Sequence, residues 1–172
     1  MPKVVTAAVL AFCALGSSAA LAQTPDPPCG PIAVAPPAEL AQWQDRTGVY
    51  AAANPAEKAP IAPQRGFDAK LRINSAVRFA MAPEKPPTEG SFGGMFELSI
   101  EQAGTYRIAI GSGAWIDVIQ DGKAISSTHH GHGPDCTGIR KMVDFPLRPG
   151  QYVLQLSGNE TPILPLLVAK LP

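Results

Sequence analysis

The chain has 172 residues, of which 45% are hydrophobic, and its 14 basic residues balance 14 acidic ones, so the formal net charge is zero. A neutral chain offers no positive field that would attract nucleic acid or an anionic membrane surface, and we expect neither as a partner. A mature length of about 150 residues suits one domain with one hydrophobic core.

The first 22 residues have the three-part layout of a secretory signal peptide. Lys3 precedes an apolar run from Val4 to Leu15, and small residues follow up to an A-x-A cleavage site at Ala20–Ala22. The run is too short to remain as a membrane-spanning helix. Cys13 follows a bulky Phe12, so no lipid anchor is expected. We predict a signal peptide over 1–22 and a periplasmic or secreted mature chain without an integral membrane segment.

Residues 23–65 are rich in proline and alanine, as in "TPDPPCGPIAVAPPAEL" and "AAANPAEKAPIAPQ". Proline restricts the backbone and lacks an N–H donor, so this stretch predicts an extended arm laid over the domain surface. One short helical turn is expected at Pro37–Gln44, where Leu40 and Trp43 fall on one face.

From Gly66 the hydrophobic pattern alternates with a period of two, and glycine or proline separates the short apolar runs. This pattern predicts an all-β domain over 66–172, an antiparallel β-sandwich of the jelly-roll type. The expected strands are Ala69–Ile73, Ala76–Met81, Met95–Ile100, Thr105–Ile110, Trp115–Gln120, Lys123–Ser127, Ile139–Phe145, Gln151–Ser157 and Leu164–Lys170.

Two turns predict which strands are neighbours. Asp121-Gly122 supplies the positive backbone angles that a two-residue hairpin needs. Pro149-Gly150 suits a type II turn with glycine at its third position, and predicts a second hairpin. Together these hairpins would set the register of the C-terminal half.

The segments "EQAGTYRIAIGSG" and "LRPGQYVLQLSGN" echo each other, with a glycine two residues before a tyrosine in each. In one interpretation Tyr106 and Tyr152 start equivalent strands of the two sheets, with buried rings and hydroxyls that reach an edge. In the other, both are ordinary strand starts.

Signal-peptide cleavage leaves Cys29 and Cys136 as the cysteines of the mature chain. Two cysteines in an exported chain predict one disulfide, because the exterior is oxidising. Closing a loop of roughly 100 residues stabilises a fold by about 4 to 5 kcal/mol in the chain-entropy model. The alternative is a pair of free thiols used as ligands or redox groups, although the C-x-x-C spacing is missing.

The segment "STHHGHGPDCTGIRK" contains the chain's three histidines, His129, His130 and His132. In an extended segment His130 and His132 point to one side and His129 to the other, so two imidazoles could share zinc, copper or iron. A further ligand could come from an aspartate, namely Asp135, Asp117 or Asp144. Two other interpretations remain: a structural loop pinned by Cys136, and a histidine cluster that responds to pH.

Nucleophilic catalysis has no motif here, because no serine lies in G-x-S-x-G and the glycine-rich stretch Gly90–Gly94 precedes a strand rather than a helix. A binding role has more support. Trp115, Tyr106 and Arg140 are the candidate ligand contacts, and a carbohydrate, a protein or a small molecule is the candidate ligand. Trp115 could equally be a residue of the sandwich core.

The pattern "AGTYRIAIGSGAWIDVIQDGK" followed by "LRPGQYVLQLSG" resembles the bacterial pre-peptidase C-terminal domain and carbohydrate-binding jelly rolls. The resemblance covers Phe92 to Leu171. It implies a sandwich fold and a binding or accessory role.

The whole chain also resembles a group of short exported proteins of Gram-negative bacteria, mainly alphaproteobacteria, that share "GSGAWIDV", "HGHGPDCTGIRKMVDF" and "PGQYVLQLSG". Some of these carry the label homogentisate 1,2-dioxygenase, an enzyme that is a longer cytosolic cupin with iron held by two histidines and a glutamate. No glutamate lies between or near the histidines of this chain. The sequence therefore predicts an exported β-sandwich binding or accessory module, with a metal-binding protein or metal-dependent enzyme as the alternative.

Overall fold

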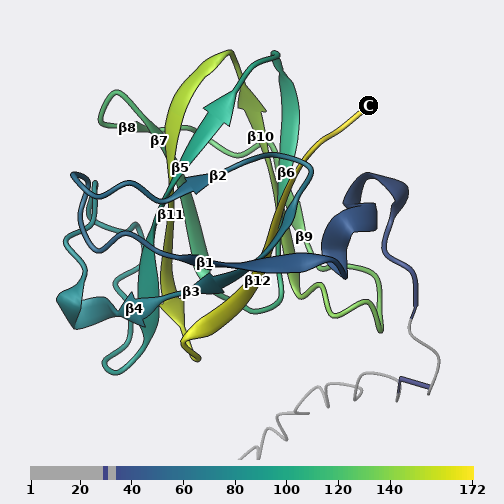
Figure 1. Ribbon diagram of the computed structural model, residues 1–172, viewed down its shortest axis with the longest axis horizontal. Helices are drawn as coiled ribbons and strands as arrows, with labels where there is room; N and C mark the ends of the chain where they lie inside the picture. Colours follow the sequence, from purple (N-terminus) through teal and green to yellow (C-terminus); the bar gives the residue numbers. More distant parts are fainter. Residues whose placement is uncertain (1–28, 31–33) are drawn as a thin grey trace, which may run out of the picture.

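The computed structural model describes residues 29–30 and 34–172, and the structural statements below concern these residues. The predicted signal peptide and residues 23–28 and 31–33 of the predicted arm lie outside them. The described chain forms a β-sandwich of two sheets, as the alternating hydrophobic pattern predicts (Figure 1).

The first sheet, sheet A, has the strand order β1-β3-β12-β6-β10-β9. Its strands are β1 (Arg46–Tyr50), β3 (Gly66–Lys70), β12 (Ile163–Lys170), β6 (Gly104–Ile110), β10 (Lys141–Leu147) and β9 (His129–Gly131). Sheet B has the order β2-β5-β11-β7-β8, with β4 beside β5. Its strands are β2 (Pro60–Ile61), β4 (Arg72–Ile73), β5 (Phe92–Ile100), β7 (Trp115–Gln120), β8 (Lys123–Ala124) and β11 (Gly150–Asn159). Neighbouring strands are antiparallel except β1 with β3 and β2 with β5, which are parallel.

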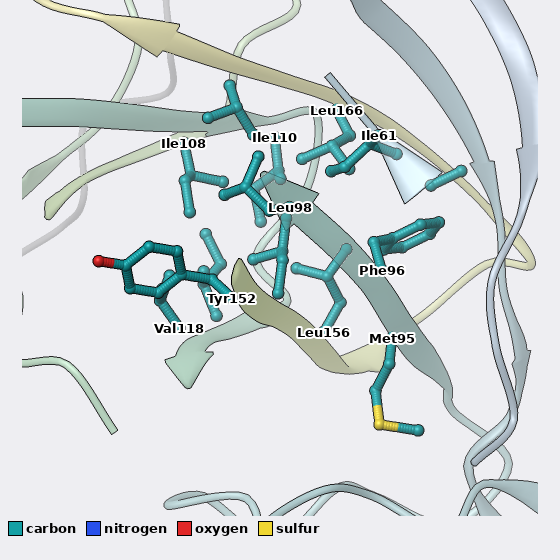
Figure 2. Packing of buried hydrophobic residues seen from close by; sticks show 14 of the residues in the cluster. Ile61, Met95, Phe96, Leu98, Ile108, Ile110, Val118, Tyr152, Leu156 and Leu166 are labelled. Carbon is teal, nitrogen blue, oxygen red and sulfur yellow. The ribbon is translucent and has the colours of Figure 1, made fainter. Parts of the chain in front are cut away.

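The main core lies between the sheets and is built from every second residue of the central strands (Figure 2). Leu98 and Leu154 of sheet B and Ile108 and Leu166 of sheet A have no exposed surface. Because successive side chains of a strand point to opposite faces, the alternation read from the sequence places these residues inside.

A second, smaller core covers the outer face of sheet A. The predicted helical turn is a 3-10 helix, η1 (Ala38–Trp43), and its Leu40 and Trp43 are buried against sheet A. The indole N–H of Trp43 donates a 3.0 Å hydrogen bond to the main-chain oxygen of Thr137. This contact ties η1 to the loop that follows β9.

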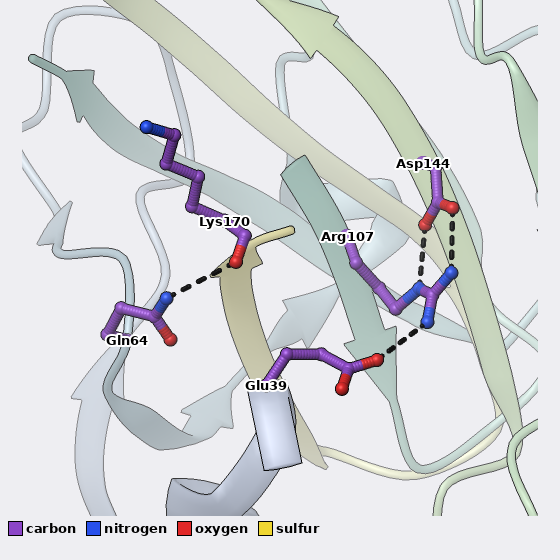
Figure 3. Close-up of polar contacts among 5 residues, drawn as sticks. All are labelled: Glu39, Gln64, Arg107, Asp144 and Lys170. Atoms are coloured by element: carbon purple, nitrogen blue, oxygen red, sulfur yellow. Dashed lines mark hydrogen bonds and ion pairs between the residues drawn. The ribbon is translucent and has the colours of Figure 1, made fainter. Parts of the chain in front are cut away.

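Arg107 of β6 joins η1 to sheet A through its guanidinium group (Figure 3). Two nitrogens donate to the two carboxylate oxygens of Asp144 at 2.8 Å, and a third lies 3.0 Å from Glu39. Asp144 is nearly buried, and the side-chain hydrogen bond to Asp144 is the largest cause of a raised pKa of Arg107. Figure 3 also shows Gln64 donating to the main-chain oxygen of Lys170.

Tyr106 and Tyr152 occupy equivalent places in the two sheets, in line with the sequence echo. Each begins its strand just after the chain has crossed from one sheet to the other, and each ring is buried. Each hydroxyl donates to a main-chain oxygen four residues earlier, that of Gln102 or of Arg148. These contacts have the form of the tyrosine corner of other β-sandwiches.

The structure differs from expectation in the predicted arm. Residues 46–61 supply β1 to sheet A and β2 to sheet B, so the sandwich begins upstream of Gly66. The sequence does not reveal β1 and β2, because it is rich in proline and because both strands are short. Each pairs in parallel with a single neighbour at the edge of its sheet. Ala51 and Ile61 of this stretch belong to the main core.

The expected strand at Ala76–Met81 is absent. A short 3-10 helix, η2 (Asn74–Ala76), is followed by an irregular segment that crosses the outer face of sheet B. There the N–H of Ala80 contacts the sulfur of Met95, and the main chain of Met81 bonds the side chain of Gln155. The irregular segment 77–91, which we call the strap, therefore packs on the sheet without forming a strand.

One of the two predicted hairpins is correct. Asp121 and Gly122 have positive φ angles of 50° and 71° and join β7 to β8, although β8 is only two residues long. The prediction for Pro149-Gly150 was wrong, because β10 lies in sheet A and β11 in sheet B. This turn carries the chain between the sheets.

Candidate functional site

The open-edge groove is a cavity of about 420 Å³ lined by β7 and β8 of sheet B, by β9 and β10 of sheet A and by Glu84 of the strap. Its apolar lining includes Ile116, Val143 and Phe145 of the main core, together with Ala124 and Ile125. The polar side chains that line it are Glu84, Trp115, Asp117, Ser126, Ser127, His130 and Lys141. The groove thus joins an apolar interior surface to a charged rim.

Asp117 is held in the groove through both carboxylate oxygens. The indole N–H of Trp115 donates to Oδ1 at 3.0 Å, and the fully buried Gln155 donates to Oδ2 at 3.1 Å. Burial raises the pKa of Asp117, and the charge of Glu84 adds to this effect, whereas the two hydrogen bonds and Lys141 oppose it. Asp117 is therefore a fixed acceptor whose charge is costly to maintain.

Lys141 approaches the same place from the opposite sheet. Its ammonium group donates to the main-chain oxygen of Ala114 at 3.1 Å and lies 5.0 Å from the ring centre of Trp115. Burial lowers the pKa of Lys141, the charge of Lys85 lowers it further, and Asp117 partly offsets both. The cation is therefore held by a ring face and a carbonyl.

Three charged side chains line this groove, namely Glu84, Asp117 and Lys141, and the charge of a fourth, Lys85, acts on Lys141 from outside the lining. Within 34–172 the ion pairs shorter than 4.0 Å join other residues, so none of these four is paired at that distance. Charged groups that face one another across a cavity without direct pairing leave their hydrogen-bonding capacity for a bound molecule.

The histidines fall on two sides of β9, as an extended segment requires. His130 is paired with Val143, whose side chain lies in the core, while His129 is paired with the outward-facing Asp144. His130 and His132 line a second hollow of about 200 Å³ beside the groove. The Nδ1 atom of His132 lies 2.7 Å from the guanidinium of Arg140.

The predicted metal ligands do not converge in this arrangement. Asp144 is engaged by Arg107, and Asp135 is exposed in the loop between β9 and β10. In the described part of the chain, no group of three or more histidine, cysteine, aspartate or glutamate side chains is placed to hold a metal ion. The cluster instead offers a pair of imidazoles, His130 and His132, beside cationic side chains.

The loop after β9 is pinned, as its structural interpretation predicted. The sulfurs of Cys29 and Cys136 lie at bonding distance with their Cα atoms 5.4 Å apart. One residue further on, the main-chain oxygen of Thr137 accepts from Trp43. Cys29 and Trp43 both belong to the N-terminal segment. This segment therefore holds the loop in place, although the loop itself is rich in glycine.

Of the three predicted ligand contacts, two line a cavity and one is buried in the core. Trp115 lines the open-edge groove and Arg140 the hollow beside it. Tyr106 is only 3% exposed, and its hydroxyl donates a hydrogen bond to the main-chain oxygen of Gln102, so it lines neither of these two cavities. Its role is to hold a corner of the sandwich.

Sequence reasoning missed the contribution of the strap and of Gln155. Glu84 and Lys85 lie in a proline-rich stretch without periodicity, and nothing local places them beside β7. Gln155 did carry a signal, since it is a polar residue in the middle of the apolar run "YVLQLSG". A buried polar residue in a central strand needs a partner, and Asp117 and Met81 supply it.

Across the described residues, no helix has the length and apolar character needed to cross a membrane. No protein-family model matches this chain, and no curated protein does. What the chain does must therefore be inferred from the groove itself.

Proposed function

We propose that the protein is an exported binding module that holds a small polar ligand in the open-edge groove. The observation that carries this proposal is the meeting of Glu84, Asp117 and Lys141 in one cavity without an ion pair among them. Shifted pKa values in a cavity are typical of functional sites. Here the shifts run in opposite directions at Asp117 and Lys141, because burial disfavours both charges.

The dimensions and lining of the groove favour a ligand with apolar and polar surfaces. Its volume of about 420 Å³ falls within the range of small-molecule pockets. Ile116, Val143 and Phe145 would contact the apolar surface of the ligand, while the charged rim would meet its hydroxyl or charged groups. A sugar or an amino acid derivative combines these two kinds of surface.

The polar groups are preorganised for recognition. Trp115 and Gln155 hold Asp117, and the carbonyl of Ala114 holds Lys141, so these groups lose little freedom when a ligand arrives. Rigidly held polar groups on β-strands allow an accessory binding domain to bind its ligand with little loss of side-chain freedom.

Export is supported by the N-terminal sequence and by the cysteines. The signal-peptide layout over 1–22 directs a chain out of the cytoplasm. Cys29 and Cys136 lie at disulfide-bonding distance, and disulfides persist in oxidising compartments.

The proposal is tested by amide and indole NMR spectra of the ¹⁵N-labelled protein with a panel of sugars and amino acids. We expect a ligand to shift the indole signal of Trp115 and to leave that of Trp43 in place, because Trp43 is buried on the far side of sheet A. Asp117→Asn and Lys141→Gln should weaken the binding about tenfold or more, since each removes a charged hydrogen-bonding group.

Lys123→Gln is the matched control, because Lys123 is an exposed lysine of β8 outside the groove lining. It should bind as the unaltered protein does. Shifts confined to residues away from the groove, or equal affinities for Lys141→Gln and Lys123→Gln, would show that the groove is not the binding site.

A further inference from the structure

The open-edge groove continues past His130 and Lys141 into the second hollow of about 200 Å³, which we call the basic hollow. The basic hollow is lined by Gly113, His130, Gly131, His132, Arg140 and Lys141. Four of these six residues carry a cationic or protonatable nitrogen, and none carries a carboxylate. Two of the histidines that were predicted to hold a metal, His130 and His132, therefore lie in a lining that is chemically suited to an anion.

The contact between His132 and Arg140 fixes which ring nitrogen donates. The Nδ1 atom lies 2.7 Å from a guanidinium nitrogen, which is always a donor, so Nδ1 acts as the acceptor in the neutral ring. The proton then resides on Nε2. His132 therefore presents an Nε2–H donor.

The positive charges of the basic hollow are only partly offset, by the charge of Asp117 acting on Lys141. In the part of the chain that the structure describes, no carboxylate lies within 4.0 Å of Arg140 or Lys141. Arg140 is exposed, and its contact with His132 leaves further guanidinium N–H groups available. A cation placed here would be repelled by Arg140 and Lys141, whereas an anion would be attracted.

We propose that the basic hollow binds an anionic group, a carboxylate or a phosphate or sulfate ester, carried by the ligand of the open-edge groove. The inference rests on the proposed function for the position of the rest of the ligand. Arg140 would form the charge-assisted hydrogen bonds to the anionic oxygens, with the Nε2–H of His132 as a further donor. The proposal narrows the ligand class to acidic molecules such as acidic sugars.

The larger polar hollow of about 830 Å³ beyond Arg140 is less suited to the anion because its lining has mixed charge. It shares Gly113 and Arg140 with the basic hollow, and Lys85, Glu89 and Glu160 also line it. The two glutamates would oppose the attraction of an anionic group to Lys85 and Arg140, whereas no carboxylate lines the basic hollow. A Cβ added at Gly113 would meet nothing within 4 Å, so there is open space between the two hollows for a neutral part of the ligand.

The experiment is an NMR titration of the ¹⁵N-labelled protein with three separate probes: inorganic phosphate, glucuronate and glucose. Glucuronate and glucose have the same ring and differ in the carboxylate. We expect glucuronate and phosphate to shift the amide signals of Gly113, Gly131 and Arg140 at millimolar concentrations, and glucose to leave them unchanged. Added salt should weaken the response, because it screens the charges.

Arg140→Gln and Arg65→Gln make the same charge change inside and outside the hollow, since Arg65 is an exposed residue of the turn before β3. We expect Arg140→Gln to weaken glucuronate binding about tenfold or more through the loss of charge-assisted hydrogen bonds. Arg65→Gln should leave it unchanged, and well-dispersed spectra of both variants confirm that they are folded.

The outcomes separate this inference from the proposed function. Loss of binding in Arg140→Gln alone supports the basic hollow. Equal binding by both variants, or no amide shift with either anion, overturns it. If glucose shifts the indole of Trp115 as strongly as glucuronate does, the groove binds a neutral ligand and only the anionic inference fails. If the anions shift the basic hollow while no probe in the wider panel reaches Trp115, the groove proposal fails instead.

Discussion

Tyr106 and Tyr152 make the same hydrogen bond at two corners of the sandwich, each to a main-chain oxygen four residues earlier, at 2.8 and 3.0 Å. Each tyrosine starts a strand just after the chain has passed from one sheet to the other. The corners lie between β5 and β6 and between β10 and β11. The sequence echo therefore reflects two equivalent corners.

We expect Tyr106→Phe and Tyr152→Phe each to lower the free energy of unfolding by about 1 kcal/mol, the net value of one hydrogen bond. The rings stay buried, so no packing is lost. Urea unfolding measures the change, and Tyr50→Phe serves as the control because Tyr50 is 67% exposed. If the corner variants unfold at the same urea concentration as Tyr50→Phe, the corner hydrogen bonds do not stabilise the fold.

A second prediction concerns the two ion pairs that Arg107 forms with Asp144 and Glu39. The side chain of Asp144 is 6% exposed, and Asp144→Asn leaves the guanidinium of Arg107 without the charge of its main partner. We expect this substitution to lower the free energy of unfolding by about 3 kcal/mol. Glu39→Gln should cost less than about 1 kcal/mol, because Glu39 is the more exposed partner. Denaturant unfolding checks both, and equal losses would contradict the different roles of the two carboxylates.

The link between Cys29 and Cys136 spans 107 residues of sequence. In the chain-entropy model a loop of this length contributes about 4 to 5 kcal/mol, so Cys29→Ala with Cys136→Ala should lower the free energy of unfolding by about 4 kcal/mol. Trp43 would still hold η1 to the loop. Mass measurement after alkylation under denaturing, non-reducing conditions is the independent check. Two alkylated thiols in exported protein would contradict the bridge.

The raised pKa of Asp117 predicts a pH-dependent stability with a definite sign. Burial raises this pKa above its ordinary value of 3.8, so the folded protein keeps the proton to a higher pH than the unfolded chain does. The stabilising contribution is present below about pH 3.8 and is lost as the pH rises through the folded pKa. The stability of the unaltered protein relative to Asp117→Asn should therefore fall over this interval.

Unfolding of the two proteins by urea at a series of pH values measures the difference, because their other carboxylates titrate alike. A constant difference, or one that changes in the opposite direction, would mean that Asp117 is not buried as the structure has it.

The local sequence predicts those parts of the fold that depend on residues close together in the chain. The period of two places Leu98, Ile108 and Leu154 inside, because alternate residues of a strand share a face. Asp121-Gly122 predicts its hairpin, because a two-residue turn needs positive φ angles at both positions. The sequence places His130 and His132 on one side of an extended segment, and both line the basic hollow.

The sequence does not reveal which sheet each strand joins or which distant residues meet. Pro149-Gly150 has the composition of a hairpin turn, but long-range pairing with β5 and β7 carries β11 into the other sheet. The strands β1 and β2 have no local periodic signal, because parallel pairing at a sheet edge defines them.

The sequence by itself determined an all-β sandwich, a cysteine pair and a concentration of histidines beside Cys136. The tertiary structure alone decided that Glu84 and Lys85 approach Asp117 and Lys141, and that His132 lies against Arg140. The physical reason is that a site depends on charge and burial created by elements far apart in the chain. The histidines by themselves suggest a metal site. In the folded protein His130 and His132 lie beside Arg140 and Lys141, and together they line a hollow suited to an anion.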